Sequence, residues 1–163
     1  MSQTQTPFGY VIPSSAAYQP SNPTAPASTS AYKMQGLSML ITPVTPTGKI
    51  ICNIGSTLIA TATTVGVGIN LQMWYGPVVS GVAPPANAAA IPAGAVQLGP
   101  TTTYETGVTL TTAADLFFPI DLMGLATGLT PNQQYWFDIA AESITTASAV
   151  QLTQINGILY ELG

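Results

Sequence analysis

The strict alternation of side chains along residues 67–75 is the feature that most restricts the fold of this chain. Apolar side chains occupy every second position, and glycine, polar residues and one tryptophan fill the positions between them. A period of two is typical of a β-strand that buries one face, whereas an amphipathic helix needs apolar positions three or four residues apart. The segment predicts a half-buried strand with the inward residues Val67, Ile69, Leu71, Met73 and Tyr75.

A second alternation covers residues 135–142 and begins with Tyr135, Trp136 and Phe137. Aromatic residues favour strands, so this segment also predicts a strand. Apolar and β-branched runs elsewhere are bounded by Gly, Pro, Asn and Ser, as strands usually are. Further strands are expected at residues 37–42, 49–54, 57–65, 116–122 and 150–162.

Proline and glycine restrict three segments. Pro119 cannot donate a ladder hydrogen bond, so it places 116–122 at a sheet edge or a bulge. Asn156-Gly157 either closes a hairpin or marks a bulge within one long strand. The alanine-rich stretch within residues 76–95 is bracketed by prolines and Gly94, so we expect a long loop there with at most one helical turn.

These strands, about eight in number, predict an all-β chain, a jelly-roll-like antiparallel β-sandwich over residues 34–163. Residues 1–33 are expected to form an extended Pro/Ser/Thr-rich arm, because residues 1–32 contain five prolines and no charged residue. The arm is either a disordered tail or a segment that docks on a neighbouring subunit, and a proline-rich arm loses less entropy on docking. The candidate docking residues are Phe8, Tyr10, Tyr18 and Tyr32.

The composition excludes several classes of function. The chain has no His and no Arg, only two Lys and a net charge of −4. The usual Ser-His-Asp and Cys-His catalysts and His-ligated metals therefore cannot form, and contact with a nucleic-acid backbone lacks its cations. No run of about 20 apolar residues predicts a membrane span, and the N-terminus shows no secretory signal. We expect no enzyme, cofactor or metal site, and no nucleic-acid or membrane partner.

A few side chains nevertheless deserve a specific expectation. Asp138 and Glu142 share one face of a straight strand, and we expect two solvated acids near a strand end. A carboxylate pair for glycoside hydrolysis or Ca²⁺ is the alternative. Cys52 lies in an apolar run with no His and no cation other than nearby Lys49 to activate it, and so predicts a buried, inert thiol.

The aromatic residues of the two alternating segments are candidates for an interface. A sandwich core or a subunit interface needs such residues, and a sugar-stacking patch is the alternative. Charged residues make up only 5% of the chain, so an obligate oligomer that hides several faces is expected. Sheet edges with few charged residues would also need partners to cover them. The interface or core aromatics are Trp74, Tyr75, Tyr135 and Trp136.

The second half of the chain contains a recognisable pattern. Its parts are Gly128–Pro131, Tyr135–Asp138, Ala140 and the closing Glu161-Leu162, together with the strand VGINLQMWYG and the segment LFFPIDLMGLATGL. With this pattern, residues 49–163 resemble small phage virion structural proteins. Such proteins are commonly trimeric jelly rolls that serve as head decoration (cement) proteins, head fibres or tail-fibre tips. The resemblance implies a homotrimer that binds a major capsid protein or another virion protein. It also implies assembly in the host cytoplasm and a final location in the virion.

The resemblance favours a decoration protein that stabilises the capsid, because the N-terminal arm could lace one unit to its neighbours. A tail-fibre or head-fibre tip that binds a host glycan or receptor is the alternative. A second resemblance concerns Leu129, Pro131 and Tyr135, whose spacing is similar to the tyrosine corner of fibronectin type III domains. That resemblance implies a different β-sandwich and is the second candidate for the fold.

Overall fold

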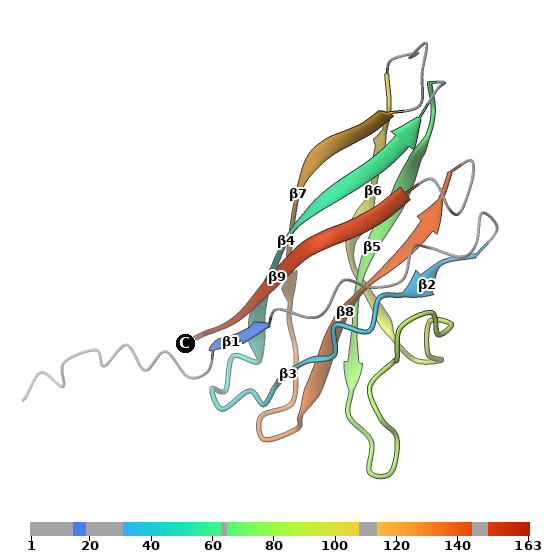
Figure 1. Cartoon of the computed structure of the whole chain (residues 1–163). Coiled ribbons are helices and arrows are strands. Elements are labelled where there is room, and N and C mark those ends of the chain that lie inside the picture. Colours follow the sequence, from blue (N-terminus) through green and yellow to red (C-terminus); the bar gives the residue numbers. More distant parts are fainter. Residues whose placement is uncertain (1–14, 19–30, 63–64, 108–113, 145–149) are drawn as a thin grey trace, which may run out of the picture.

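The computed structural model describes residues 15–18, 31–62, 65–107, 114–144 and 150–163, and Figure 1 shows their arrangement. Every regular element in these residues is a β-strand. The strands form two antiparallel sheets, ordered β1-β9-β4-β7 and β2-β8-β5-β6, and β3 also pairs with β8. The bounds are β1 Ser15–Tyr18, β2 Lys33–Met34, β3 Met39–Ile41, β4 Lys49–Ala62, β5 Gly68–Pro77, β6 Val96–Glu105, β7 Ala114–Ala126, β8 Tyr135–Ser143 and β9 Val150–Leu162.

The order in which strands pair identifies the fold. β1 pairs with β9, β2 and β3 pair with β8, β4 pairs with β7, and β5 pairs with β6. The chain is thus one long antiparallel ribbon folded back between β5 and β6. The ribbon is rolled so that β4 also meets β9 and β5 also meets β8. This connectivity is that of a jelly roll, which confirms the all-β, jelly-roll-like antiparallel sandwich expected from the sequence.

The core lies between the two sheets and is built by the alternation that the sequence shows. In β5, Ile69, Leu71 and Met73 point inward, and in β8 the inward positions are Tyr135, Phe137, Ile139 and Ala141. Tyr75 stacks on Phe137 with ring centroids 5.4 Å apart. The opposite sheet contributes the alternate residues of β4, β7 and β9. Its most deeply buried side chains include Ile50, Cys52, Ile54, Leu58, Leu152 and Leu159.

The expected strands 49–54 and 57–65 merge into one strand, β4, which ends at Ala62. β4 runs unbroken through Gly55, and the irregularity is absorbed by a bulge in β9 opposite Ser56. Gln154 has a positive φ of 52° at that bulge. Asn156-Gly157 forms no hairpin and lies inside β9, two residues after the bulge. Of the two alternatives left open for Asn156-Gly157, the hairpin is wrong and the single long strand is found, but its bulge lies before Asn156 and not at Asn156-Gly157.

β6 was not expected, because Gly99-Pro100 interrupts its sequence pattern. The structure accommodates this pair as a bulge against β5, where the register shifts between Leu71 and Met73. Gly99 takes a φ of 79° there, which glycine adopts without steric cost. Pro119 also lies as predicted, since β7 pairs only with β4 within the described residues and forms a sheet edge.

Part of the segment expected as an arm belongs to the sandwich. Ser15–Tyr18 form β1 on the outer edge of β9, and Lys33–Met34 form β2 on β8. Both strands need only backbone partners at an open edge, which a proline-rich composition does not prevent. Phe8 and Tyr10 lie outside the described residues. Tyr18 is described only through its backbone pairing with Gly157.

Candidate functional site

The two sheets differ in what covers their outer faces. The outer face of β8 and β5 carries Trp74, Trp136 and Ala140, which form a small second core. Met34 packs against them from β2, and Tyr32, Val78, Ile91 and Ala95 lie around them. The covering segments are tied to each other, since the Met34 N–H donates to the Ala89 carbonyl at 2.9 Å and Met34 accepts from Ala88 at 2.9 Å. This outer face is therefore closed by the chain itself.

The four aromatic candidates divide between the two sides of this sheet. Tyr75 and Tyr135 face the main core, with ring centroids 6.4 Å apart. Trp74 and Trp136 face outward into the second core. Trp136 is only 5% exposed, and it lies over Gly76, where a Cβ would come within 2.8 Å of the indole. Strand alternation separates these side chains, so the four do not form one stacking surface for a sugar.

Tyr135 carries a local feature that the sequence indicated. Its hydroxyl accepts a hydrogen bond from the Thr130 backbone N–H at 3.0 Å, which ties down the turn before β8. This is the interaction of a tyrosine corner. The strand pairing around it is nevertheless that of a jelly roll, so the fibronectin-like fold is wrong. A short motif can fix a turn because it depends on neighbouring residues, whereas the fold depends on distant pairings.

Asp138 is not the solvated acid that was expected. Its side chain is 1% exposed and accepts hydrogen bonds from the Gly36 N–H at 3.0 Å and the Ile139 N–H at 2.7 Å. Burial raises the pKa of Asp138 to about 7, while the backbone donors act in the opposite direction. The carboxyl anchors the turn between β2 and β3, which covers the sheet at this point. Glu142 shares the same face and is half-buried beside Tyr32.

Cys52 and Glu161 are also structural. Burial raises the pKa of the Cys52 thiol to about 12, which suppresses the reactive thiolate. The predicted buried thiol is thus found, with 1% exposure. Glu161 is 5% exposed, and its Oε1 accepts hydrogen bonds from the backbone N–H groups of Val44 and Thr45. Within the described residues, no three His, Cys, Asp or Glu side chains come together as a possible metal site.

One end of the outer face of the other sheet is apolar, and no described residue covers it. Outward positions alternate along β4, β7 and β9, and the pairing places them in rows. Ile51 lies opposite both Leu125 and Tyr160, and in the next row Asn53 lies opposite Met123 and Ile158. Met123 is 71% exposed, Leu125 49%, Tyr160 41% and Leu162 36%. We call this surface the apolar face; its residues are Ile51, Met123, Leu125, Ile158, Tyr160 and Leu162.

Sequence reasoning missed the apolar face, although β7 carries a signal for it. Both its inward positions, such as Ile120 and Leu122, and its outward positions Phe117, Met123 and Leu125 are largely apolar. A strand that is apolar on both faces is typical of a sheet covered on both sides. Contiguous exposed apolar surface of this kind marks an interaction site more often than isolated residues do.

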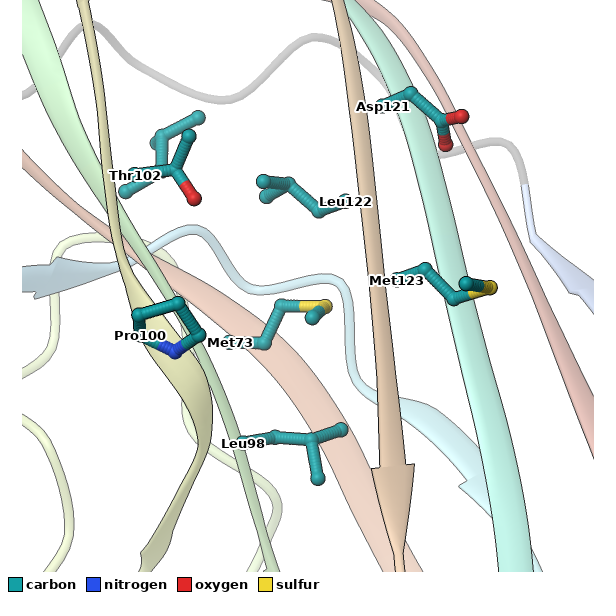
Figure 2. A pocket seen from close by; sticks show the side chains of 8 residues that line it. Met73, Leu98, Pro100, Thr102, Asp121, Leu122 and Met123 are labelled. Atoms are coloured by element: carbon teal, nitrogen blue, oxygen red, sulfur yellow. The ribbon is translucent and has the colours of Figure 1, made fainter.

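A cavity of about 180 Å³ lies beside the apolar face, between β5, β6 and β7. Figure 2 shows Met73, Leu98 and Leu122 gathered in it, while Asp121 and Met123 point to the other side of β7. Gly124 adjoins this region, because a Cβ there would lie 2.6 Å from Leu98 Cγ. The cavity is thus a partly open part of the main core between the edge strands β6 and β7. Met123 is one of the residues around the cavity and also belongs to the apolar face.

Comparison with known proteins adds little to this geometry. The sequence matches no protein-family model and no curated protein. Among solved structures, the crystal structure of the infectious bursal disease virus VP2 subviral particle is similar at 9% identity and a TM-score of 0.21. The match covers 91% of this chain but 41% of that chain, so this chain spans less than half its length. In the described residues, no helix has the length and apolar character to span a membrane. The apolar face is therefore the candidate functional site on its own geometry.

Proposed function

We propose that this chain is a phage virion structural protein, a capsid decoration (cement) protein that acts as a homotrimer. The observation that carries the proposal is the apolar face, where Met123, Leu125 and Tyr160 lie together with 41–71% of each side chain exposed. A chain with two basic and six acidic residues has few charges to keep such a surface soluble. A closed oligomer buries the face without open-ended association.

The assignment to a virion is drawn from the sequence resemblance over residues 49–163. The jelly roll supports it as the fold that the resemblance implies, although a fold alone serves many functions. The resemblance also supplies the partner, a major capsid protein or another virion protein. The chain would reach its place during particle assembly in the host cytoplasm.

The mechanism of a cement protein is mechanical. Each trimer adds buried contact area across junctions between capsomers. Because it binds the assembled shell and not the separated subunits, binding shifts the equilibrium toward the shell. At a concentration 100 times Kd, this linkage contributes about 2.7 kcal/mol for each site. Many equivalent sites on one shell would multiply the effect.

The test begins with the purified full chain. Light scattering on a sizing column should give about three times 16.8 kDa. Purified empty capsids of the phage that encodes the chain, stripped of decoration protein, should then co-sediment with it and withstand a higher temperature. Trimers that neither bind nor stabilise these capsids would refute the proposal.

The alternative, a fibre tip, requires an exposed binding groove for a glycan or receptor. Trp136 is 5% exposed, Trp74 is half-buried against the second core, and Tyr75 packs against the main core. Capsid decoration is therefore the better-supported function. Hits on a glycan array, combined with no capsid binding, would replace it with the fibre-tip function.

A further inference from the structure

We propose that the apolar face of one copy is the docking surface for residues 1–14 of a neighbouring copy. The proposal rests on the proposed function to the extent that it requires an oligomer.

The apolar face has defined limits along the sheet. Lys49 pairs with Leu162 at one end, and Asp121 pairs with Gly55 two positions beyond Met123 at the other. Between these limits, the outward positions of the three strands hold no charged residue. A partner for this surface should therefore be uncharged, extended enough to cross three strands, and supplied with apolar side chains.

The start of β1 places such a segment beside the face. β1 runs antiparallel to β9, with Ser15 opposite Tyr160 and Tyr18 opposite Gly157. Followed backward from Tyr18 to Ser15, the strand runs toward the C-terminal end of β9. The chain that precedes Ser15 thus begins next to Tyr160 and Leu162, which are members of the apolar face.

The composition of residues 1–14 fits the surface. The segment contains no charged residue, and its apolar side chains Phe8, Tyr10, Val11 and Ile12 are close together. Fourteen extended residues reach roughly 46 Å. Three neighbouring strands span only about 10 Å between the outer two, so length does not limit the contact. Proline lowers the entropy lost when an extended segment docks.

The direction of β1 favours a neighbouring copy over the same copy. At Ser15 the strand heads past the end of its own sheet, away from Ile51 and Met123. To reach its own apolar face, the chain before Ser15 would have to turn back toward Ile51 and Met123. Continuing onto the next copy requires no reversal. Repetition of the same contact around a three-fold axis closes the ring and covers each face once.

The other sheet shows that this chain covers the outer face of a sheet with a loop and a short edge strand. Its outer face is closed by Met34 from β2 and by residues of the loop that follows β5, such as Ile91 and Ala95. These segments are also rich in alanine and proline and nearly free of charge. A similar cover on the apolar face would bury the outer side of the sheet formed by β4, β7 and β9.

The experiment is photocrosslinking in the full-length chain. Ile12 is replaced by p-benzoylphenylalanine, and the protein is mixed with unmodified, ¹⁵N-labelled chain and allowed to exchange subunits. After irradiation, mass spectrometry should find mixed-isotope crosslinks to residues 121–125 of β7 or 156–162 of β9. Crosslinks within one copy, crosslinks to other surfaces, or no crosslinks would each overturn the proposal.

Two double variants test the surface directly. Met123→Ser with Leu125→Ser should lower the yield of mixed-isotope crosslinks at least tenfold. The matched control, Val79→Ser with Val82→Ser, removes exposed valines from the loop after β5 and should leave the yield unchanged. All four side chains are exposed, so both variants should unfold near the temperature of the parent chain. An unchanged crosslink yield in the first variant would contradict the assignment of the face.

The failure of this inference can be separated from the failure of the proposed function. A chain that is monomeric at every concentration has no neighbouring copy, so both the trimer and the exchange would be refuted. A trimer without crosslinks to the apolar face would refute only the exchange. A trimer with those crosslinks that binds no capsid would uphold the exchange and refute capsid decoration.

Discussion

Gly157 offers the sharpest test of how the two sheets close on each other. It lies in β9, and a Cβ built at this position would overlap Met39 Sδ and lie 3.2 Å from Met39 Cε. Met39 is in β3 of the opposite sheet and is 1% exposed. Gly157→Ala should therefore force Met39 to move. Overpacking of this kind costs roughly 1–3 kcal/mol of unfolding free energy.

A double-mutant cycle isolates this contact. Met39→Ala alone removes a buried side chain and should cost roughly 2–5 kcal/mol. The cavity that it leaves lies beside position 157, so the methyl group of Gly157→Ala then finds space. The double variant should be more stable than the sum of the single effects predicts, by roughly 1–3 kcal/mol.

The assay is urea unfolding of the full chain, followed by circular dichroism at fixed protein concentration. Gly107→Ala is the matched control, because a Cβ there meets nothing within 4 Å. Its effect should stay within about 0.5 kcal/mol. If the single effects of Gly157→Ala and Met39→Ala add within about 0.5 kcal/mol, the contact between the two sheets is refuted.

Three further predictions concern Cys52, Asp138 and Gly36. Cys52 should resist iodoacetamide at pH 8 in the native protein and react once urea unfolds it, because burial raises its pKa to about 12; rapid native labelling would contradict this. Asp138 has an ordinary pKa of 3.8 when unfolded and about 7 when folded, so the native state retains a proton that the unfolded chain releases. Stability should fall by up to roughly 4 kcal/mol between pH 4 and 7 and then level off, and Asp138→Asn should flatten urea midpoints across that range. Gly36→Ala should lower the melting temperature by several degrees, because Gly36 has a φ of 72° and a Cβ would lie 2.5 Å from the Asn87 N atom; an unchanged temperature would exclude that clash.

The strands that the sequence predicted best are those whose pattern reports burial directly. β5 alternates because one face meets the main core, and this holds whatever strand lies beside it. β8 was also predicted as a strand, but it is buried on both faces, which its pattern did not indicate. Pro119 likewise indicated an edge through its missing N–H, a property of the residue itself. The all-β fold class followed from the number of strands that the sequence predicted.

The features that the sequence did not reveal depend on distant partners. β6 forms despite Gly99-Pro100, since β5 tolerates a bulge opposite Gln72. Gly157 resembled a turn residue, yet its small size serves the packing of Met39 from another sheet. Asp138 looked solvated because the turn that buries it lies about a hundred residues earlier in the chain. Local composition carries no information on such contacts.

The placement of the acids bears on the meaning of the apolar face. Low charge was expected to leave the sheet edges in need of partners, but the edge strands hold Glu105 in β6 and Asp115 and Asp121 in β7, all exposed. These are half of the six acids in the chain. Charge at an edge discourages pairing with another strand. β7 thus carries a charge at Asp121 and none two residues later at Met123, on the same outward side of the strand. The uncharged character of the apolar face is consequently a property of that position and not a by-product of scarce charge, as expected for a surface that is covered in the assembled protein.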